Sequence, residues 1–372
     1  MRFKWVAVLS LSLLCLLTVG QITLAQEPTP ARTIPITSKG FGAKLSPDGK
    51  TLVTFENAIL LGLKEVDPTL LPMHVIDIST GKERGQLSGF TDFASDVAFT
   101  SDGSQLVSIH SNGDIYVWNM VNLQQVRSLQ TPLLGYMQVK MFPDNKQILT
   151  LSPGNLQRLM LIDIETGAIT QSFGQHFDSY TDFQNNYTQF PAMGDLMFAA
   201  FNISPDGAVI ASSTANDEVR VWTVGGNQYQ VVREKSEKPG LFNIRQLAFT
   251  PDRSSLVYYD ASDMKTHIWD LATQKEKAVL DIGSDTFALS PDGTMIAWAT
   301  RVKEGAGTVS VAPIDAPDKA SVVLTLPEGL QVAPRVTWVT FTQDGRQVVV
   351  GGFFSSAPED NQIYVINVPS AS

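Results

Sequence analysis

Apolar and polar side chains alternate in seven short segments of this chain, and each segment ends in a similar turn. The turns read LSPDG at 45–49, FTSDG at 99–103, MFPDN at 141–145, ISPDG at 203–207, FTPDR at 249–253, LSPDG at 289–293 and FTQDG at 341–345. Three and five residues before the turn aspartate the side chain is always apolar, and between them it is small or polar. This period of two predicts a β-strand. Pro-Asp-Gly predicts a tight hairpin, because aspartate bonds back to the backbone and glycine adopts a positive φ.

Further strands are predicted after every turn. The second strand begins at once, as in QLVSI at 105–109, and a third follows in each repeat, as in IYVWNM at 115–120. In several repeats a second turn and a more polar segment come next, such as QQVRSLQ at 124–130. Four antiparallel strands in each of seven repeats predict an all-β fold, a seven-bladed β-propeller.

The last repeat lacks a fourth strand, because only PSAS follows its third strand at 363–368. The segment RTIPIT at 32–37 precedes the first repeat and has no other sheet to join. We expect it to be the outer strand of the last blade, which would close the ring and remove open sheet edges. The propeller is therefore predicted to span 32–369, after a linker at 26–31.

The repeats resemble those of WD-repeat β-propellers over about residues 31–369. In that family a hydrogen-bonded tetrad contains an aspartate six residues before a strand-three tryptophan, and the histidine of a Gly-His pair ahead of strand one. Trp269-Asp270 is the family dipeptide and Asp263 takes the place of the tetrad aspartate, but the sequence has no Gly-His pair. The resemblance therefore implies an incomplete network, with blade closure by apolar packing. We interpret these residues as structural: Trp118, Trp222, Trp269, Asp270, Asp263, Asp48, Asp102, Asp206 and Asp292.

Composition and the first 25 residues indicate whether the chain folds and where in or outside the cell it is found. With 43% hydrophobic and 17% charged residues, the chain is expected to fold. Residues 1–25 begin with Arg2 and Lys4, continue as an apolar run and end in Thr-Leu-Ala, which predicts a cleaved signal peptide and a secreted or periplasmic protein. Cleavage would remove the only cysteine, and no membrane span is expected afterwards. The net charge of −10 argues against nucleic acid as a partner.

The histidines are the main candidates for catalysis. His74 and His267 occupy the same strand-three position, where the other repeats carry unlike residues, so we expect both to be structural. His110 and His176, with acidic neighbours, could gather at the mouth of the central channel. A propeller-type hydrolase or lyase acting there is the alternative function. The sequence has no nucleophile elbow, zinc-protease motif or phosphate loop, so we assign no catalytic residue, metal ligand or cofactor.

Long insertions point to a binding surface. The connections after some second strands and the segment at about 174–196 are predicted to emerge on one face of the ring. Aromatic residues in a polar loop are typical of recognition surfaces. The candidate partner-binding residues are His176, Phe177, Tyr180, Phe183, Tyr187, Phe190, Lys64, Glu65 and Asp67. In the other interpretation these loops fold back over the propeller. The resemblance implies a scaffold that binds a protein or peptide, and a cell-envelope ligand is also open, while the oligomeric state is not predicted.

Overall fold

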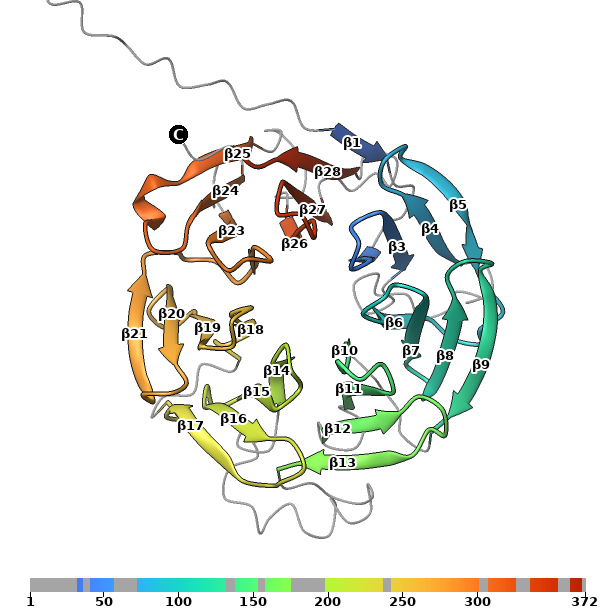
Figure 1. Cartoon of the computed structure of the whole chain (residues 1–372), viewed down its shortest axis with the longest axis horizontal. Coiled ribbons are helices and arrows are strands. Elements are labelled where there is room, and N and C mark those ends of the chain that lie inside the picture. The colour runs from blue at the N-terminus through green and yellow to red at the C-terminus, as the bar shows by residue number, and fades with distance from the viewer. Residues whose placement is uncertain are drawn as a thin grey trace, which may run out of the picture.

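The strands form seven four-stranded antiparallel sheets arranged around a ring, in the part of the chain that the structure describes (Figure 1). The computed structural model describes residues 32–35, 41–56, 72–131, 138–152, 158–174, 198–236, 242–300, 307–325, 335–353 and 362–369. The predicted all-β, seven-bladed propeller is confirmed.

The first four blades follow the chain in order, and the strands of each run from the inner to the outer edge of its sheet. Blade 1 contains β2 (Phe41–Leu45), β3 (Thr51–Glu56), β4 (Met73–Asp77) and β5 (Lys82–Leu87). Blade 2 contains β6 (Ala94–Phe99), β7 (Gln105–His110), β8 (Asp114–Asn119) and β9 (Gln124–Gln130). Blade 3 contains β10 (Gln138–Met141), β11 (Gln147–Ser152), β12 (Arg158–Asp163) and β13 (Ile169–Phe173). Blade 4 contains β14 (Phe198–Ile203), β15 (Val209–Thr214), β16 (Val219–Thr223) and β17 (Tyr229–Arg233).

The remaining blades complete the ring. Blade 5 contains β18 (Leu247–Phe249), β19 (Ser255–Asp260), β20 (Lys265–Asp270) and β21 (Lys275–Leu280). Blade 6 contains β22 (Phe287–Leu289), β23 (Met295–Thr300), β24 (Thr308–Pro313) and β25 (Ser321–Thr325), with a 3-10 turn at Pro317–Lys319. Blade 7 contains β26 (Arg335–Phe341), β27 (Gln347–Phe353), β28 (Gln362–Asn367) and, as its outer strand, β1 (Arg32–Pro35).

Strand β1 closes the ring as predicted. It pairs antiparallel with β28, with Ile34 opposite Ile363, and it lies beside β28 in Figure 1. The Ile34 side chain is 1% exposed and packs in the apolar cluster between blades 7 and 1. The Arg32 guanidinium donates to the backbone oxygens of Ile78 and Ser79 in blade 1. The N-terminal strand therefore belongs to blade 7 and is also bonded to blade 1. The last two residues of the predicted strand lie outside the described part of the chain.

The repeated turn is held by its own aspartate. In the first copy the Ser46 hydroxyl donates to Asp48 Oδ1 at 2.6 Å, and the Lys50 N–H donates to the same oxygen at 3.1 Å. Five of the other copies repeat this arrangement, with serine or threonine two residues before the aspartate. The residue after the aspartate has a positive φ, which glycine adopts without strain; Asn145 at 59° and Arg253 at 63° are the exceptions. The turn thus explains why this phrase recurs.

The hydrophobic core lies between blades and not within them. The buried apolar side chains of the described residues form seven clusters, and each cluster draws on two neighbouring blades. Val53, Phe55 and Val75 of blade 1, for example, pack with Leu106 and Trp118 of blade 2. A single blade therefore buries its apolar faces only when both neighbours are in place, which is typical of repeat folds.

Candidate functional site

Blade 2 contains a buried chain of hydrogen bonds that starts at Trp118. The Trp118 Nε1–H donates to Ser108 Oγ at 3.0 Å, and Ser108 Oγ lies 3.0 Å from His110 Nε2. His110 Nδ1 lies 2.6 Å from the backbone oxygen of Asp92. Because that oxygen can only accept, Nδ1 carries the proton and Nε2 accepts from the Ser108 hydroxyl. The three side chains thus form one donor-to-acceptor series across β7 and β8.

This network changes the interpretation of His110. Its side chain is fully buried, with the Phe90 ring 5.0 Å away and the Tyr116 ring 4.8 Å away. Burial lowers the pKa of His110 to about 4, so the ring is neutral at neutral pH. The hypothesis that His110 stands at the channel mouth is therefore wrong. In this blade the end of strand two supplies the histidine that a Gly-His pair was expected to supply. The tetrad is still incomplete, as expected, because Asn112 takes the aspartate position and its amide donates to Thr91 and Asp114 instead.

Blades 4 and 5 carry altered versions of the network. In blade 4 the Trp222 Nε1–H donates to Ser212 Oγ at 2.8 Å, while Thr214 stands where blade 2 has His110. In blade 5 Tyr258 takes the place of the serine, and the buried Trp269 Nε1–H has no hydrogen-bond partner among the described residues. The tryptophans predicted to be structural thus lie at equivalent positions, with a hydrogen bond in two of the three blades.

His74 and His267 lie on sheet faces, each paired with a glutamate of the neighbouring outer strand. His74 Nδ1 lies 2.9 Å from Glu83 Oε2, and His267 Nδ1 lies 2.7 Å from Glu276 Oε1. The His267 ring also stacks on Tyr258 at 5.0 Å. The structural interpretation of both histidines agrees with these contacts.

The turn aspartates also have structural partners, since they accept hydrogen bonds from residues of their own turns. The Thr100 hydroxyl, with Ser104, lowers the pKa of Asp102 to about 2, and the same kind of contact from Ser204 lowers the pKa of Asp206 to about 2. Asp270 accepts from the Thr273 N–H at 2.7 Å in the turn after β20. These carboxylates stabilise turns. The sequence predicted a turn role for Asp102 and Asp206, and for Asp270 only a structural role.

One group of side chains in blade 5 has the spacing of metal ligands. Ligand atoms of Asp260, Asp263 and His267 lie within 4.8 Å of one another. Asp260 is already bound, since Arg233 Nε donates to it at 2.5 Å and the Ser262 N–H donates at 2.8 Å. The arrangement is explained by this buried ion pair between β17 and β19, and we assign no metal to it.

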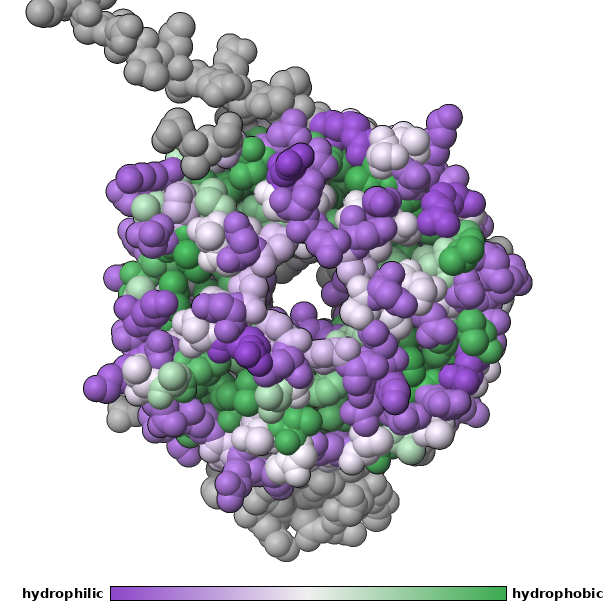
Figure 2. Space-filling model, in the orientation of Figure 1, coloured by the Kyte–Doolittle hydropathy of each residue, from purple (hydrophilic) through white to green (hydrophobic). Residues whose placement is uncertain are grey.

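The axis of the ring is open at its centre (Figure 2). Polar side chains of the inner strands reach from one blade to the next. Lys44 Nζ of blade 1 lies 3.5 Å from Asp96 Oδ1 of blade 2, and Asp96 Oδ2 accepts from the Val139 N–H of blade 3 at 3.0 Å. In the same way Asn202 Nδ2 of blade 4 donates to the Leu247 oxygen of blade 5 at 2.7 Å. The inner strands of these neighbouring blades are therefore joined by polar contacts as well as by the core.

The predicted partner-binding residues lie outside the described part of the chain. They are His176, Phe177, Tyr180, Phe183, Tyr187, Phe190, Lys64, Glu65 and Asp67. The described strands on either side show where their segments attach. The 175–197 segment connects β13 of blade 3 to β14 of blade 4, and the 57–71 segment connects β3 to β4 within blade 1. Each of these two insertions therefore connects the strands that the sequence predicted for it.

A groove between blades 4 and 5 was not predicted from the sequence. It has a volume of about 300 Å³ and is lined by Val209, Val221, Tyr229 and Leu271, among others. Tyr229 is 45% exposed, and the Arg220 guanidinium lies 4.8 Å from its ring centroid. Within the described residues, no helix is long and apolar enough to cross a membrane.

Comparisons with known proteins agree with this architecture. A family model described as WD domain, G-beta repeat matches residues 81–119, from the outer strand of blade 1 to the third strand of blade 2. The WD repeat-containing protein WDS homolog of Arabidopsis thaliana is 25% identical over 206 residues, which are 53% of this chain. The chain spans about a third of that relative, since the match covers 34% of it.

A solved structure also resembles the whole ring. The β-propeller domain of Myceliophteria thermophila Cps50 (Swd1) superposes with a TM-score of 0.64 at 12% identity. The match covers 91% of this chain and 100% of that chain. At this identity the likeness shows the fold alone.

Proposed function

We propose that this chain, a seven-bladed β-propeller of WD40 repeats, is a scaffold that binds a protein or peptide partner through the face that carries its long insertions. Propellers of WD40 repeats bind proteins, and they typically serve as interaction scaffolds. The insertions vary from blade to blade while the strands and turns repeat, so the insertions are where one such ring can differ from another. A second possible ligand of the same face is a component of the cell envelope.

The observation that supports this proposal is that the described histidines and turn aspartates, which could otherwise act in catalysis, make structural contacts within the blades. His110 is buried in the Trp118 network, and the described turn aspartates accept hydrogen bonds from their own turns. His74 and His267 pair with glutamates on sheet faces. A hydrolase or lyase at the channel mouth would need converging acid and base groups, and His110 is removed from that set by its burial. We therefore favour binding over catalysis.

We also propose that the protein is exported and acts as a secreted or periplasmic protein. The support is the order of charges, apolar run and small residues in 1–25. Fractionation of the producing cells, followed by N-terminal sequencing of the mature protein, tests this step. A mature protein beginning at Gln26 supports export, and an intact N-terminus in the cytoplasmic fraction contradicts it.

Affinity capture tests the scaffold proposal. The full-length chain is compared with a variant in which residues 176–193 are replaced by a short Gly-Ser linker. The control carries Lys50→Ser in an exposed turn of blade 1, away from the predicted insertion face. We expect a discrete partner to be retained by the full-length chain and by the control, and lost from the loop variant. Retention by all three proteins would contradict the placement on this loop, and failure of all three to retain a partner would contradict the scaffold.

A further inference from the structure

Lys140 departs from the pattern of polar contacts between the inner strands. Lys44 reaches Asp96 of the next blade, and Asn202 reaches the backbone oxygen of Leu247 in the next blade. Lys140 stands at the equivalent position of blade 3, four residues before its turn aspartate. Among the described residues it makes no hydrogen bond or ion pair with blade 4. The cation therefore lies between two blades without a partner in the next blade like those of Lys44 and Asn202.

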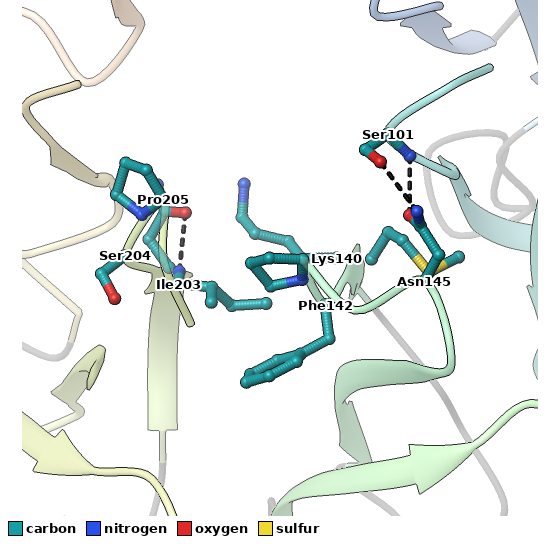
Figure 3. Close-up of a pocket in the computed structure, with 10 residues that line it drawn as sticks. Ser101, Lys140, Phe142, Asn145, Ile203, Ser204 and Pro205 are labelled. Atoms are coloured by element: carbon teal, nitrogen blue, oxygen red, sulfur yellow. Dashed lines mark hydrogen bonds between the residues drawn. The ribbon is translucent and has the colours of Figure 1, made fainter. Parts of the chain in front are cut away.

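A cavity lies beside Lys140, between blade 3 and its neighbours. It has a volume of about 290 Å³, and its wall is formed by the turns of blades 2, 3 and 4, with Ser101, Lys140, Asn145 and Pro205 among its residues. Figure 3 shows Lys140 extending into the space between the Ser101–Asn145 pair and Pro205. The volume is at the lower end of the range of ligand pockets, about 300–1,000 Å³. It suits a small group and not a large organic ligand.

Three other polar side chains of the cavity wall, those of Ser101, Asn145 and Ser204, are already hydrogen-bonded. Asn145 Nδ2 donates to Ser101 Oγ at 2.7 Å, and the Ser101 N–H donates to Asn145 Oδ1 at 2.7 Å. The Ser204 hydroxyl donates to Asp206 at 2.7 Å. Ser101 Oγ still has its own proton to donate, and the Lys140 ammonium has three. The Lys140 ammonium and the Ser101 hydroxyl are thus two donors that a ligand could use.

The charges around Lys140 leave it short of a counter-ion. Two charged groups act on it electrostatically, Lys44 on β2 of blade 1 and Asp96 on β6 of blade 2. Asp96 already accepts from the Val139 N–H and pairs with Lys44. Burial, and to a smaller extent the charge of Lys44, lowers the pKa of Lys140 to about 8, while Asp96 acts in the opposite direction. An added negative charge would stabilise the ammonium.

We propose that the cavity between blades 3 and 4 binds a small oxyanion, a carboxylate or phosphate group, through the Lys140 ammonium with the Ser101 hydroxyl as second donor. This site lies at the inner-strand turns, and it does not depend on the insertions or on the proposed scaffold function. Because only the protonated amine attracts an anion, affinity should fall as the pH rises through about 8.

Calorimetric titration with sodium phosphate and, separately, sodium acetate at constant ionic strength tests the site. The full-length chain is compared with Lys140→Met, which keeps an unbranched side chain of similar length, and with Lys146→Met, an exposed lysine in the turn after β10. We expect one anion per chain, with affinity reduced about tenfold or more in Lys140→Met because a charge-assisted hydrogen bond is lost. Lys146→Met should bind as the unsubstituted chain does. Phosphate binding without acetate binding would assign the site to phosphate, and the reverse would assign it to carboxylates.

A second measurement does not depend on the variant. The pKa of Lys140 is followed by NMR of chains labelled with ¹³C at lysine Cε, with and without saturating anion. Binding should raise this pKa from about 8 toward the ordinary value of 10.5. An unchanged pKa with both anions would overturn the proposal. Equal affinity of the Lys140→Met and unsubstituted chains would overturn it as well.

Discussion

Acidification should weaken the protein through His110 before it affects any turn aspartate. Burial keeps the His110 ring neutral in the folded chain, and its Nε2 accepts from Ser108 in that form. In the unfolded chain the ring has its ordinary pKa of 6.5. Because the folded pKa is the lower of the two, protonation favours the unfolded state. The stability contributed by the neutral ring is complete above pH 6.5 and is lost as the pH falls toward 4.

The size of this loss follows from the two pKa values. Lowering the pKa of His110 from 6.5 to about 4 corresponds to about 3 kcal/mol of free energy, at 1.36 kcal/mol per pKa unit. Domains have a total stability of roughly 5–15 kcal/mol. Protonation of this one ring should therefore remove a large part of the free energy of unfolding.

Urea unfolding at several pH values between 7 and 4 measures the effect. The full-length chain is compared with His110→Gln, which cannot titrate, and with His74→Gln, which removes a half-exposed histidine. We expect the unsubstituted chain and His74→Gln to lose about 3 kcal/mol over this range, and His110→Gln, less stable at pH 7, to lose much less. The lowered pKa values of Asp102 and Asp206 act in another window, since their contribution is lost only as the pH falls from 3.8 toward 2. Equal pH dependence of the three proteins between pH 7 and 4 would refute the reasoning.

Other predictions concern the turns, the ring closure and the tryptophan network, and urea unfolding at pH 7 measures all of them. Arg253→Gly should raise the free energy of unfolding by up to about 1 kcal/mol, because it removes a positive-φ side chain that costs roughly 1–2 kcal/mol and loses only a surface ion pair; a lower value would contradict this. Ile34→Ala should cost about 2–5 kcal/mol, since the side chain is 1% exposed, and a cost below 1 kcal/mol would show that β1 does not hold the ring. Ser108→Ala should cost more than Ser212→Ala, because it leaves two buried ring nitrogens without partners instead of one; the reverse order would contradict the network.

The fold was predictable because the same pattern of alternating strand and aspartate turn occurs seven times in the sequence. A single Ser-Pro-Asp-Gly turn would have indicated one hairpin, whereas seven copies in register with alternating strands indicate a ring. The outer strand of the last blade could be predicted because the seventh repeat lacked a fourth strand and the segment at 32–37 had no other sheet to join. The insertions follow no such repeat, so their residues were assigned from composition alone.

The roles of His110 and Lys140 were harder to predict for different reasons. Ser108 and His110 are two residues apart on one strand, so they face the same side, and Trp118 lies on the neighbouring strand. That combination was visible in the sequence and would have indicated the network. The environment of Lys140 was not visible, because it depends on the distance between blades, which no pattern within one strand contains.

The pairing of β1 with β28 determines the order in which the protein can be completed. During synthesis the residues of β1 are made before those of its partner strand β28, and strands β2 to β27 lie between the two in the sequence. Until then blade 7 has no outer strand, and the core between blades 7 and 1 stays open to solvent. The nascent chain must therefore keep the β1 segment unpaired until β28 has been made. A chain that stops before residue 362 would leave two unpaired sheet edges, which are sites of self-association.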